Sequence, residues 1–386
     1  MLLIKNARIY PVVGPIIDRG DILIEDGKIK ALGGDLGQPE GAELIEAAGM
    51  NVYPGFIEAH SHLGLDEEAI GFEGQDYNES VDPVTPHLRS IDSINPMDGT
   101  FRQAYEGGVT VANTGQGSAN VLGGSFAALK TYGHRVDDMI VKYPTGMKCA
   151  FGENPKRVYK DQDKSPMTRM ATAALLREYL MRAKIYKAKK DRAQDLGDYP
   201  EFDMKLEALL PVIEKKIPLK AHAHRADDIF TSLRIAKEFD LDISLDHCTE
   251  GHLIADDLAR EGRPAIVGPS FGHRTKFELK NTDFKTARVL VEAGVKVAIT
   301  TDSPVIPIQH LPMCAAFAVG AGLDEAEALR CITINPAEII GIGDRVGSLE
   351  VGKDADLVII TGNPLRDVNY RVEKTIIDGR LVYSSK

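Results

Sequence analysis

The chain of 386 residues contains no tryptophan and only four cysteines, none of which forms a Cys-x-x-Cys pair. Neither a disulfide framework nor a zinc ribbon is therefore indicated, and reduced thiols fit a cytoplasmic protein. No apolar run approaches the length of a membrane span, and Lys5 and Arg8 place charges where a signal peptide needs an unbroken apolar stretch. These absences predict a cytoplasmic protein that does not bind membranes.

Long blocks of like charge are also missing. The chain has 46 basic and 57 acidic residues, which gives a formal net charge of −11. A protein of this charge without a basic patch is a poor partner for the phosphates of nucleic acids or for an anionic membrane surface. The apolar fraction of 43% is ordinary for a globular enzyme, so a small-molecule substrate is the expected partner.

The most informative motif is the segment 54–62, PGFIEAHSH, an apolar run that ends in His60-Ser61-His62. Side chains two residues apart on a β-strand point to the same face, so His60 and His62 can converge on one cation. Alone, this motif is weak, because two histidines near a turn are often merely solvated or hydrogen-bonded.

Three further strand-like runs end in residues that bind metals. Segment 217–224 ends in His222-Ala223-His224, segment 241–247 ends in His247, and segment 295–302 ends in Asp302. A parallel barrel collects the residues at the carboxyl ends of all its strands on one face, which is where its catalytic groups lie. The four runs together therefore predict a metal site at one mouth of such a barrel.

On these residues the chain resembles the amidohydrolase superfamily of metal-dependent hydrolases, and the likeness covers nearly its whole length. Within the superfamily it is most similar to the group around imidazolonepropionase, the prolidase-like hydrolases and N-acetylglucosamine-6-phosphate deacetylase. The resemblance implies one or two divalent metals, with Zn²⁺ favoured and Fe²⁺ or Mn²⁺ as alternatives, and it implies metal ligands at His60, His62, His222, His247 and Asp302.

The fold class expected is α/β, a TIM-like (β/α)8 barrel with a small β-sandwich formed by both termini. Residues 1–53 and 344–386 read as short strands and tight turns, such as Asp26-Gly27 between apolar runs, and residues 54–343 form the barrel. Eight strand-like runs end near His62, Thr114, Lys130, Gly152, His222, His247, Gly268 and Asp302. Residues 155–217 form either a helical insertion that acts as a lid or a long crossover between two strands.

Asp302 is the expected catalytic general base, since a carboxylate beside an activated water can accept its proton and pass it to a leaving amine. His222 is the preferred ligand over His224, which then contacts the substrate or supports the site through a hydrogen bond. The fourth strand offers two rival ligands. Some members of the superfamily use a carboxylated lysine and others a glutamate, and Glu153 is slightly preferred over Lys148 because it lies at the turn beyond the strand.

The predicted reaction is hydrolysis of an amide, a lactam or another C–N bond, with substrate contacts from Lys148, His224, Arg225, His252 and His273. Many deaminases of the superfamily, and imidazolonepropionase, carry Glu at the position of Arg225. This departure favours peptide-like or N-acyl substrates, whose carboxylate an arginine would hold. Deamination of a heterocyclic base and a non-catalytic scaffold remain the alternatives. Analogy with other barrel enzymes suggests a homo-oligomer.

Overall fold

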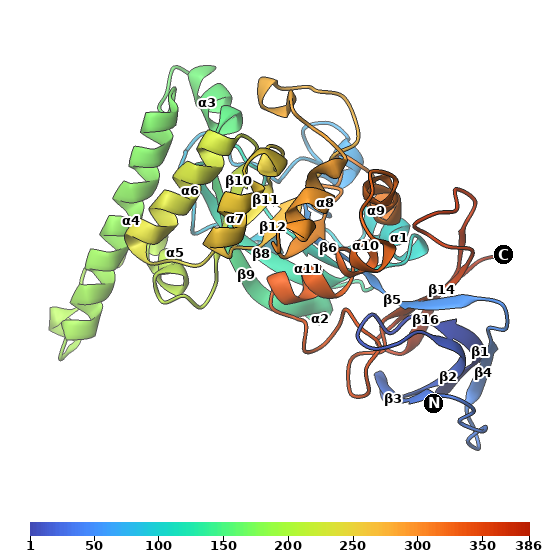
Figure 1. Ribbon diagram of the computed structural model, residues 1–386. Helices are drawn as coiled ribbons and strands as arrows, with labels where there is room; N and C mark the ends of the chain where they lie inside the picture. Colours follow the sequence, from blue (N-terminus) through green and yellow to red (C-terminus); the bar gives the residue numbers. More distant parts are fainter.

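Two β-sheets organise the chain in the computed structural model, which describes residues 1–386 except for the side chain of Leu196. One sheet curls into a nearly closed barrel with helices around it, and the other is built from both ends of the chain and lies beside the barrel (Figure 1). The predicted α/β class and the pairing of the two termini are confirmed.

The barrel sheet contains the eight strands that the sequence predicts, in sequence order. The side chains of its short strands are almost all buried, as expected for strands covered on both faces. Thr300 closes the circle from the last strand to the first, because its hydroxyl donates a hydrogen bond of 2.8 Å to the backbone oxygen of His60. The strands are β6 (Phe56–Ser61), β7 (Val109–Thr114), β8 (Leu122–Lys130), β9 (Ile140–Ala150), β10 (Leu219–Ala223), β11 (Ile243–His247), β12 (Ala265–Val267) and β13 (Val297–Ile299).

The third strand departs from the parallel arrangement that the sequence suggested. β8 runs antiparallel to both β7 and β9, whereas the other neighbouring pairs are parallel. Residues 115–121 alone connect β7 to β8, and parallel neighbours need a crossover of about a dozen residues or more. The carboxyl end of β8 at Lys130 therefore lies at the rim opposite the predicted metal site.

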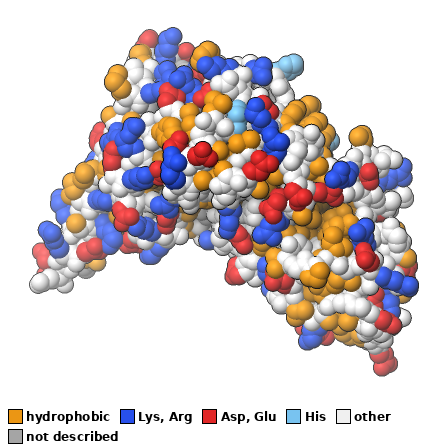
Figure 2. Space-filling view, in the orientation of Figure 1, with side chains coloured by type: hydrophobic (Ala, Val, Ile, Leu, Met, Phe, Trp, Pro, Cys, Tyr) orange, Lys and Arg blue, Asp and Glu red, His pale blue; other side chains and the backbone are white. Residues whose placement is uncertain are grey.

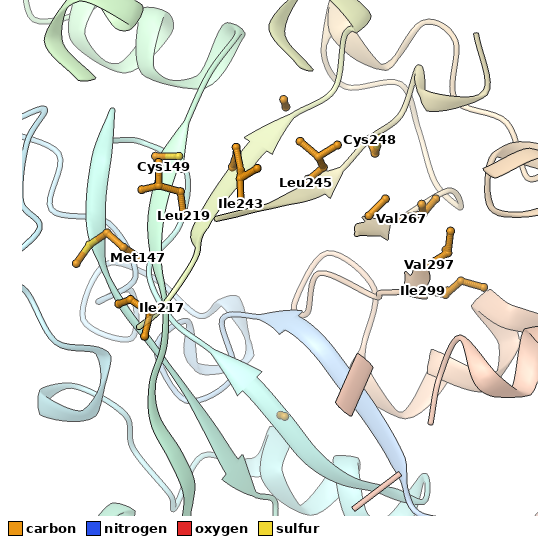
Figure 3. Close-up of a cluster of buried hydrophobic side chains, with 14 of the residues drawn as sticks. Met147, Cys149, Ile217, Leu219, Ile243, Leu245, Cys248, Val267, Val297 and Ile299 are labelled. Atoms are coloured by element: carbon orange, nitrogen blue, oxygen red, sulfur yellow. The ribbon is translucent and has the colours of Figure 1, made fainter. Parts of the chain in front are cut away.

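Alternation along the strands separates the helix-facing side chains from those inside the barrel. Figure 3 shows apolar side chains of β9 to β13 in one buried cluster, among them Met147, Cys149 and Leu245. Lys148 lies between Met147 and Cys149, and Asp246 follows Leu245. The side chains of Lys148 and Asp246 therefore point to the opposite face, into the barrel interior. Both are completely buried.

Helices cover the outside of the barrel (Figure 1). The segment predicted as a lid or crossover contains three of them, and the long α4 packs against α5 and α6 on the outer side. This arrangement is that of a crossover between β9 and β10. The helices are α1 (Gly99–Glu106), α2 (Val136–Met139), α3 (Glu153–Lys160), α4 (Arg169–Arg192), α5 (Met204–Ile213), α6 (Ala226–Phe239), α7 (Ala255–Glu261), α8 (Lys285–Glu292), α9 (Leu311–Gly320), α10 (Glu325–Arg330) and α11 (Ile334–Ile339).

The second sheet joins the two termini through the antiparallel pair β5 and β14. The Asp26-Gly27 turn predicted from the sequence connects β2 to β3, and both of its residues have positive φ. The strands are β1 (Leu2–Ile9), β2 (Ile17–Glu25), β3 (Lys28–Gly33), β4 (Glu43–Glu46), β5 (Asn51–Pro54), β14 (Leu357–Thr361), β15 (Arg371–Ile377) and β16 (Arg380–Ser384).

A buried lysine ties this sheet region to the barrel. The Nζ atom of Lys130 lies 3.0 Å from Asp354, 2.7 Å from Asp356 and 3.0 Å from Asp378. Burial lowers the pKa of Lys130, but the three carboxylates outweigh that effect and raise it overall. The reversed direction of β8 thus brings a cation to the junction between the two sheets.

The molecular surface is mixed in charge. Acidic and basic side chains are interspersed over the face drawn in Figure 2, in line with the absence of long like-charge blocks in the sequence. Among the helices that the structure describes, none is long and apolar enough to cross a membrane.

Candidate metal centre and active site

Six predicted side chains meet at the mouth of the barrel and fall into two groups that could each hold a metal ion. The groups are His60, His62 and Asp302, and His222, His224 and His247. In each group, one ligand atom from every residue lies within 4.8 Å of the others. The residues come from the ends of β6, β10 and β11 and from the turn after β13, as the sequence predicts.

Asp302 connects the two groups. Its Oδ1 atom lies 3.4 Å from Nε2 of His60 and 3.4 Å from Nε2 of His62, and its Oδ2 atom lies 4.0 Å from Nδ1 of His247. His247 and Asp302 both have positive φ, at 73° and 53°. Such backbone is uncommon for residues other than glycine and clusters at functional sites.

Hydrogen bonds at Nδ1 fix the ring orientation of four of the histidines. His62 and His247 donate to the backbone oxygens of Gly115 and Gly268 at 2.7 and 2.8 Å, which leaves their Nε2 lone pairs free. His222 and His224 share hydrogen bonds of 2.8 Å with the hydroxyls of Ser118 and Thr249. Metal-binding histidines are usually held in this way by a partner at the other ring nitrogen.

The donor set fits a divalent cation. Asp302 Oδ1 is buried and accepts no hydrogen bond, although it faces two imidazole nitrogens. A buried carboxylate oxygen without a partner costs free energy, and a cation shared with His60 and His62 would remove that cost. Imidazole and carboxylate groups are the ligands of zinc and related metals.

The protonation states also suit metal binding, which needs neutral imidazoles and an ionised carboxylate. Burial holds the pKa of His222 and of His224 well below the usual value, and it lowers the pKa of His247 to about 3. Burial alone would raise the pKa of Asp302, but the interactions with His247, His60 and His62 outweigh it and keep this pKa well below the usual range.

Lys148 lies in the centre of the site. Its Nζ atom is 3.4 Å from Nε2 of His60 and 3.6 Å from Oδ2 of Asp246. Burial lowers the pKa of Lys148 to about 8, while Asp246 opposes that shift. Asp246 also lies 3.1 Å from Nδ1 of His60, so this carboxylate, which the sequence analysis did not single out, positions both groups.

Glu153, Arg225 and His252, which the sequence also predicts, are not among the candidate ligands. Glu153 begins α3 and belongs to neither group of candidate ligands, whereas the next residue, Asn154, lines the cavity and lies 3.5 Å from Nε2 of His222. Arg225 forms a two-point ion pair with Asp227 on α6, at 2.9 Å for both contacts. His252 hydrogen-bonds Thr286 of α8, which draws its ring away from the barrel mouth.

A cavity of about 900 Å³ is lined by four of the candidate ligands, His62, His222, His224 and Asp302. His273 lines it, as predicted, together with basic side chains that sequence reasoning missed, Arg157 of α3 and Lys276 of the loop before α8. Lys276 donates a hydrogen bond of 3.1 Å to Asn154 and lies 3.3 Å from Nε2 of His224. The only signal for Arg157 in the sequence is its place in the segment that follows the fourth strand.

A second missed residue, Glu278, is 1% exposed and belongs to the same loop, in the short turn Phe277–Leu279. Its Oε1 atom lies 3.6 Å from Nε2 of His224, 3.8 Å from Nε2 of His222 and 3.1 Å from Nζ of Lys276. Its Oε2 atom accepts a hydrogen bond from the backbone of Glu153. No periodicity or motif in the sequence marks this residue.

The fold and the site define a metal-dependent hydrolase of carbon–nitrogen bonds. Residues 51–382 match the model of the amidohydrolase family, and the chain belongs to that family.

Particular relatives agree with this assignment. The solved structure of an amidohydrolase from Thermotoga maritima MSB8 is 43% identical, with a TM-score of 0.96 and complete coverage of both chains. An imidazolonepropionase from Porphyromonas gingivalis strain ATCC 33277 is 25% identical over 98% of this chain and 92% of its own. The amidohydrolase tasK of Hapsidospora irregularis is 30% identical over 90% of this chain, which spans only 38% of that relative's length.

Proposed function

We propose that this hydrolase cleaves an amide bond in a peptide-like or N-acyl substrate, using two divalent cations, with Zn²⁺ favoured and Fe²⁺ or Mn²⁺ as alternatives. The observation that carries this proposal is the position of Asp302 between two groups of imidazoles, with one oxygen unpartnered. One group would hold the first cation with His60, His62 and Asp302. The second cation would be held by His222 and His247, with His224 beside them.

A bound cation of this kind lowers the pKa of water toward about 7 and polarises the substrate carbonyl. The protein residues then handle the proton. Asp302, with its low pKa, is ionised at neutral pH and can accept a proton from the attacking water. The same carboxyl group can deliver that proton to the nitrogen of the leaving amine, which completes the hydrolysis.

The ligand from the fourth strand, we propose, is Lys148 and not Glu153. Lys148 lies 3.4 Å from His60, whereas Glu153 belongs to neither candidate group. The amine would carry a carboxyl group formed with CO₂, which turns a buried cation into an anionic ligand. A native mass spectrum should show the added mass of one CO₂, and Lys148→Met should abolish it. A spectrum without that mass in active protein would contradict the assignment.

We propose that Lys276 and Arg157, and not Arg225, bind the carboxylate of the substrate. Arg225 is paired with Asp227 and does not line the cavity, whereas Arg157 and Lys276 do line it, with Glu278 3.1 Å from Lys276. Lys276 stands beside His224, so a substrate whose carbonyl approaches the metal centre would bring a terminal carboxylate toward these cations. Charge-assisted hydrogen bonds of this kind are the strong ones in ligand recognition.

A second candidate reaction, deamination of a heterocycle or opening of a cyclic amide, is favoured by Glu278. Many deaminases of the superfamily carry a glutamate after the fifth strand, at the position where this chain has Arg225. Glu278 brings a carboxylate to within 3.8 Å of His222 from a different loop. It could therefore serve as the additional proton carrier that those reactions need.

The test is a substrate screen with metal-loaded protein. Dipeptides, N-acyl amino acids, cyclic amides and amino-substituted purines and pyrimidines are compared by kcat/KM. Hydrolysis in the first two classes, abolished by a chelator and restored by Zn²⁺, is the expected result. Activity on amino-heterocycles alone would contradict the preferred substrate class, and no activity with metal bound would favour the scaffold alternative.

Location and assembly are proposals as well. A cytoplasmic location is supported by four free cysteines, three of them buried. A homo-oligomer is supported by the apolar side chains that α4 exposes, Met170, Met181 and Ile185. Light scattering coupled to size exclusion would test the assembly, and a monomer at micromolar concentration would refute it.

A further inference from the structure

Asp66 is a buried carboxylate in the cavity that the hydrolytic mechanism does not use. It follows β6 by five residues, lines the cavity with His62 and Tyr77, and is only 6% exposed. Its Oδ1 atom is buried and has no hydrogen-bond partner. A buried carboxylate in this state is costly, so a ligand that donates to it would gain affinity.

The backbone of Asp66 forms a β-bridge with Gln75, but its side chain has no structural partner among the described residues. It occupies the N-cap position of the short 3-10 turn Glu67–Ala69, where an aspartate usually accepts a backbone hydrogen bond, yet its side chain forms no such bond. Within the part of the chain that the structure describes, no lysine or arginine forms an ion pair with it. Burial raises the pKa of Asp66, with His62 opposing that shift and Asp98 adding to it.

The position of Asp66 relative to the basic side chains is informative. Asp66 follows β6, the first strand of the barrel, whereas Lys276 lies against His224 of β10, the fifth. The first and fifth strands of an eight-stranded barrel stand on opposite sides of its axis. The candidate metal ligands lie between them, so the cavity has one wall with Asp66 and an opposite wall with Lys276, whose charge is partly offset by Glu278 at 3.1 Å.

We propose that Asp66 is a recognition site for a positively charged substrate group, most simply the free amino group of an unblocked dipeptide. The inference rests on the proposed function and refines it, because a substrate held at both walls must carry an ammonium group at one end and a carboxylate at the other. An N-acyl amino acid offers only the carboxylate. Asp66 would therefore favour dipeptides over N-acyl amino acids, two substrate classes that the hydrolytic mechanism alone does not distinguish.

The cavity rim suits an apolar side chain on such a substrate. Phe72, Phe271 and Val305 line the opening and are all substantially exposed. A phenylalanine residue in the substrate would cover part of this apolar surface. Alanyl-phenylalanine is therefore a suitable probe, and N-propionyl-phenylalanine is its matched partner because it differs only by replacement of the ammonium group with hydrogen.

The experiment measures kcat/KM for both probes with the wild type and with Asp66→Asn. The wild type should prefer alanyl-phenylalanine, and Asp66→Asn should lose that preference by roughly 10-fold to 100-fold, the range expected for a hydrogen bond between charged groups. The loss should be mainly in KM, and activity on N-propionyl-phenylalanine should change less than about threefold. Asp66→Glu, which keeps the charge, should retain most of the preference.

Two controls separate recognition from other roles. The exposed Asp18→Asn variant, in the terminal sheet, should behave as the wild type on both probes. Metal content and Tm of Asp66→Asn should match those of the wild type. An equal loss on both probes, or a loss of bound metal, would overturn this inference alone. A metal-loaded wild type that cleaves neither probe would refute the proposed function and this inference with it.

Discussion

The orientation of His60 is set by Asp246, which directly precedes the candidate ligand His247 in the sequence. Asp246 approaches His60 Nδ1 at 3.1 Å and Lys220 at 3.1 Å, and it is completely buried. Asp246→Asn should weaken metal binding about 10-fold to 100-fold, the usual cost of losing a carboxylate that orients a ligand histidine. Competition with a chromophoric chelator measures this affinity.

The matched control for that variant is Asp242→Asn. This half-exposed aspartate lies just before the same strand and pairs with Arg263. Its metal affinity should equal that of the wild type. If Asp246→Asn also bound metal with unchanged affinity, the carboxylate would have no role in orienting His60.

Asp302 is expected to act as the proton carrier in addition to its role as a ligand. Asp302→Asn should reduce kcat by about 100-fold to 10,000-fold, the range typical of general acid–base catalysis. The assay must use protein whose metal content has been measured. A variant that retains both metals and near-normal kcat would show that another group carries the proton, with Glu278 as the first candidate.

At the residue scale, the sequence predicted the side chains that end strands and missed those on loops. His60, His62, His222, His247 and Asp302 each end a recognisable apolar run, so their convergence followed from the barrel. Lys276 and Glu278 lie in a loop without periodicity, and their position depends on contacts with α3. Such contacts depend on three-dimensional packing, which leaves no pattern in a single sequence.

At the scale of elements, Glu58 links β6 to β13 and so helps to close the barrel. Its carboxylate accepts hydrogen bonds from the hydroxyl of Thr300 at 2.6 Å and from the backbone and hydroxyl of Thr301 at 2.8 and 2.6 Å. Burial raises the pKa of Glu58 to about 7, although these hydrogen bonds oppose the shift. The folded protein therefore binds a proton here that the unfolded chain releases near pH 4.5.

This shift predicts a pH dependence of stability with a definite sign. Between about pH 4.5 and 7 the folded state holds more protons at Glu58 than the unfolded state, so stability falls as the pH rises. The contribution is at most about 1.4 kcal/mol per pH unit. Glu58→Gln cannot titrate, and the Tm of the metal-free wild type should fall relative to that of Glu58→Gln across this range. Parallel Tm curves would contradict the shift.

The number of strands could be predicted from the sequence, but the direction of one of them was missed. Apolar runs mark all eight strands, and the positions at which they end agree closely with the structure. The sequence predicts β8 as parallel to its neighbours only because a (β/α)8 barrel is built from parallel strands. The short connection 115–121 indicates an antiparallel β8, since it leaves no room for the crossover that a parallel strand needs.

At the scale of the whole molecule, the Lys130 cluster joins the barrel to the sheet formed by the termini. Lys130→Met should destabilise the protein by about 3 kcal/mol, because it leaves Asp356 buried without a cation, while Asp354 keeps Lys28 and Arg345. Thermal denaturation measures this effect. Lys142→Met is the control and should change Tm little, because Lys142 is partly exposed and makes one hydrogen bond, to the backbone oxygen of Gly341. Equal effects of the two variants would contradict the structural role of the cluster.

The whole account depends on two cations meeting at Asp302. Anomalous diffraction from crystals of zinc-loaded protein, measured at the zinc edge, tests this claim most directly. The account predicts one peak bonded to His60, His62 and Asp302 and a second bonded to His222 and His247. Zinc peaks elsewhere, with none within bonding distance of Asp302, would contradict it.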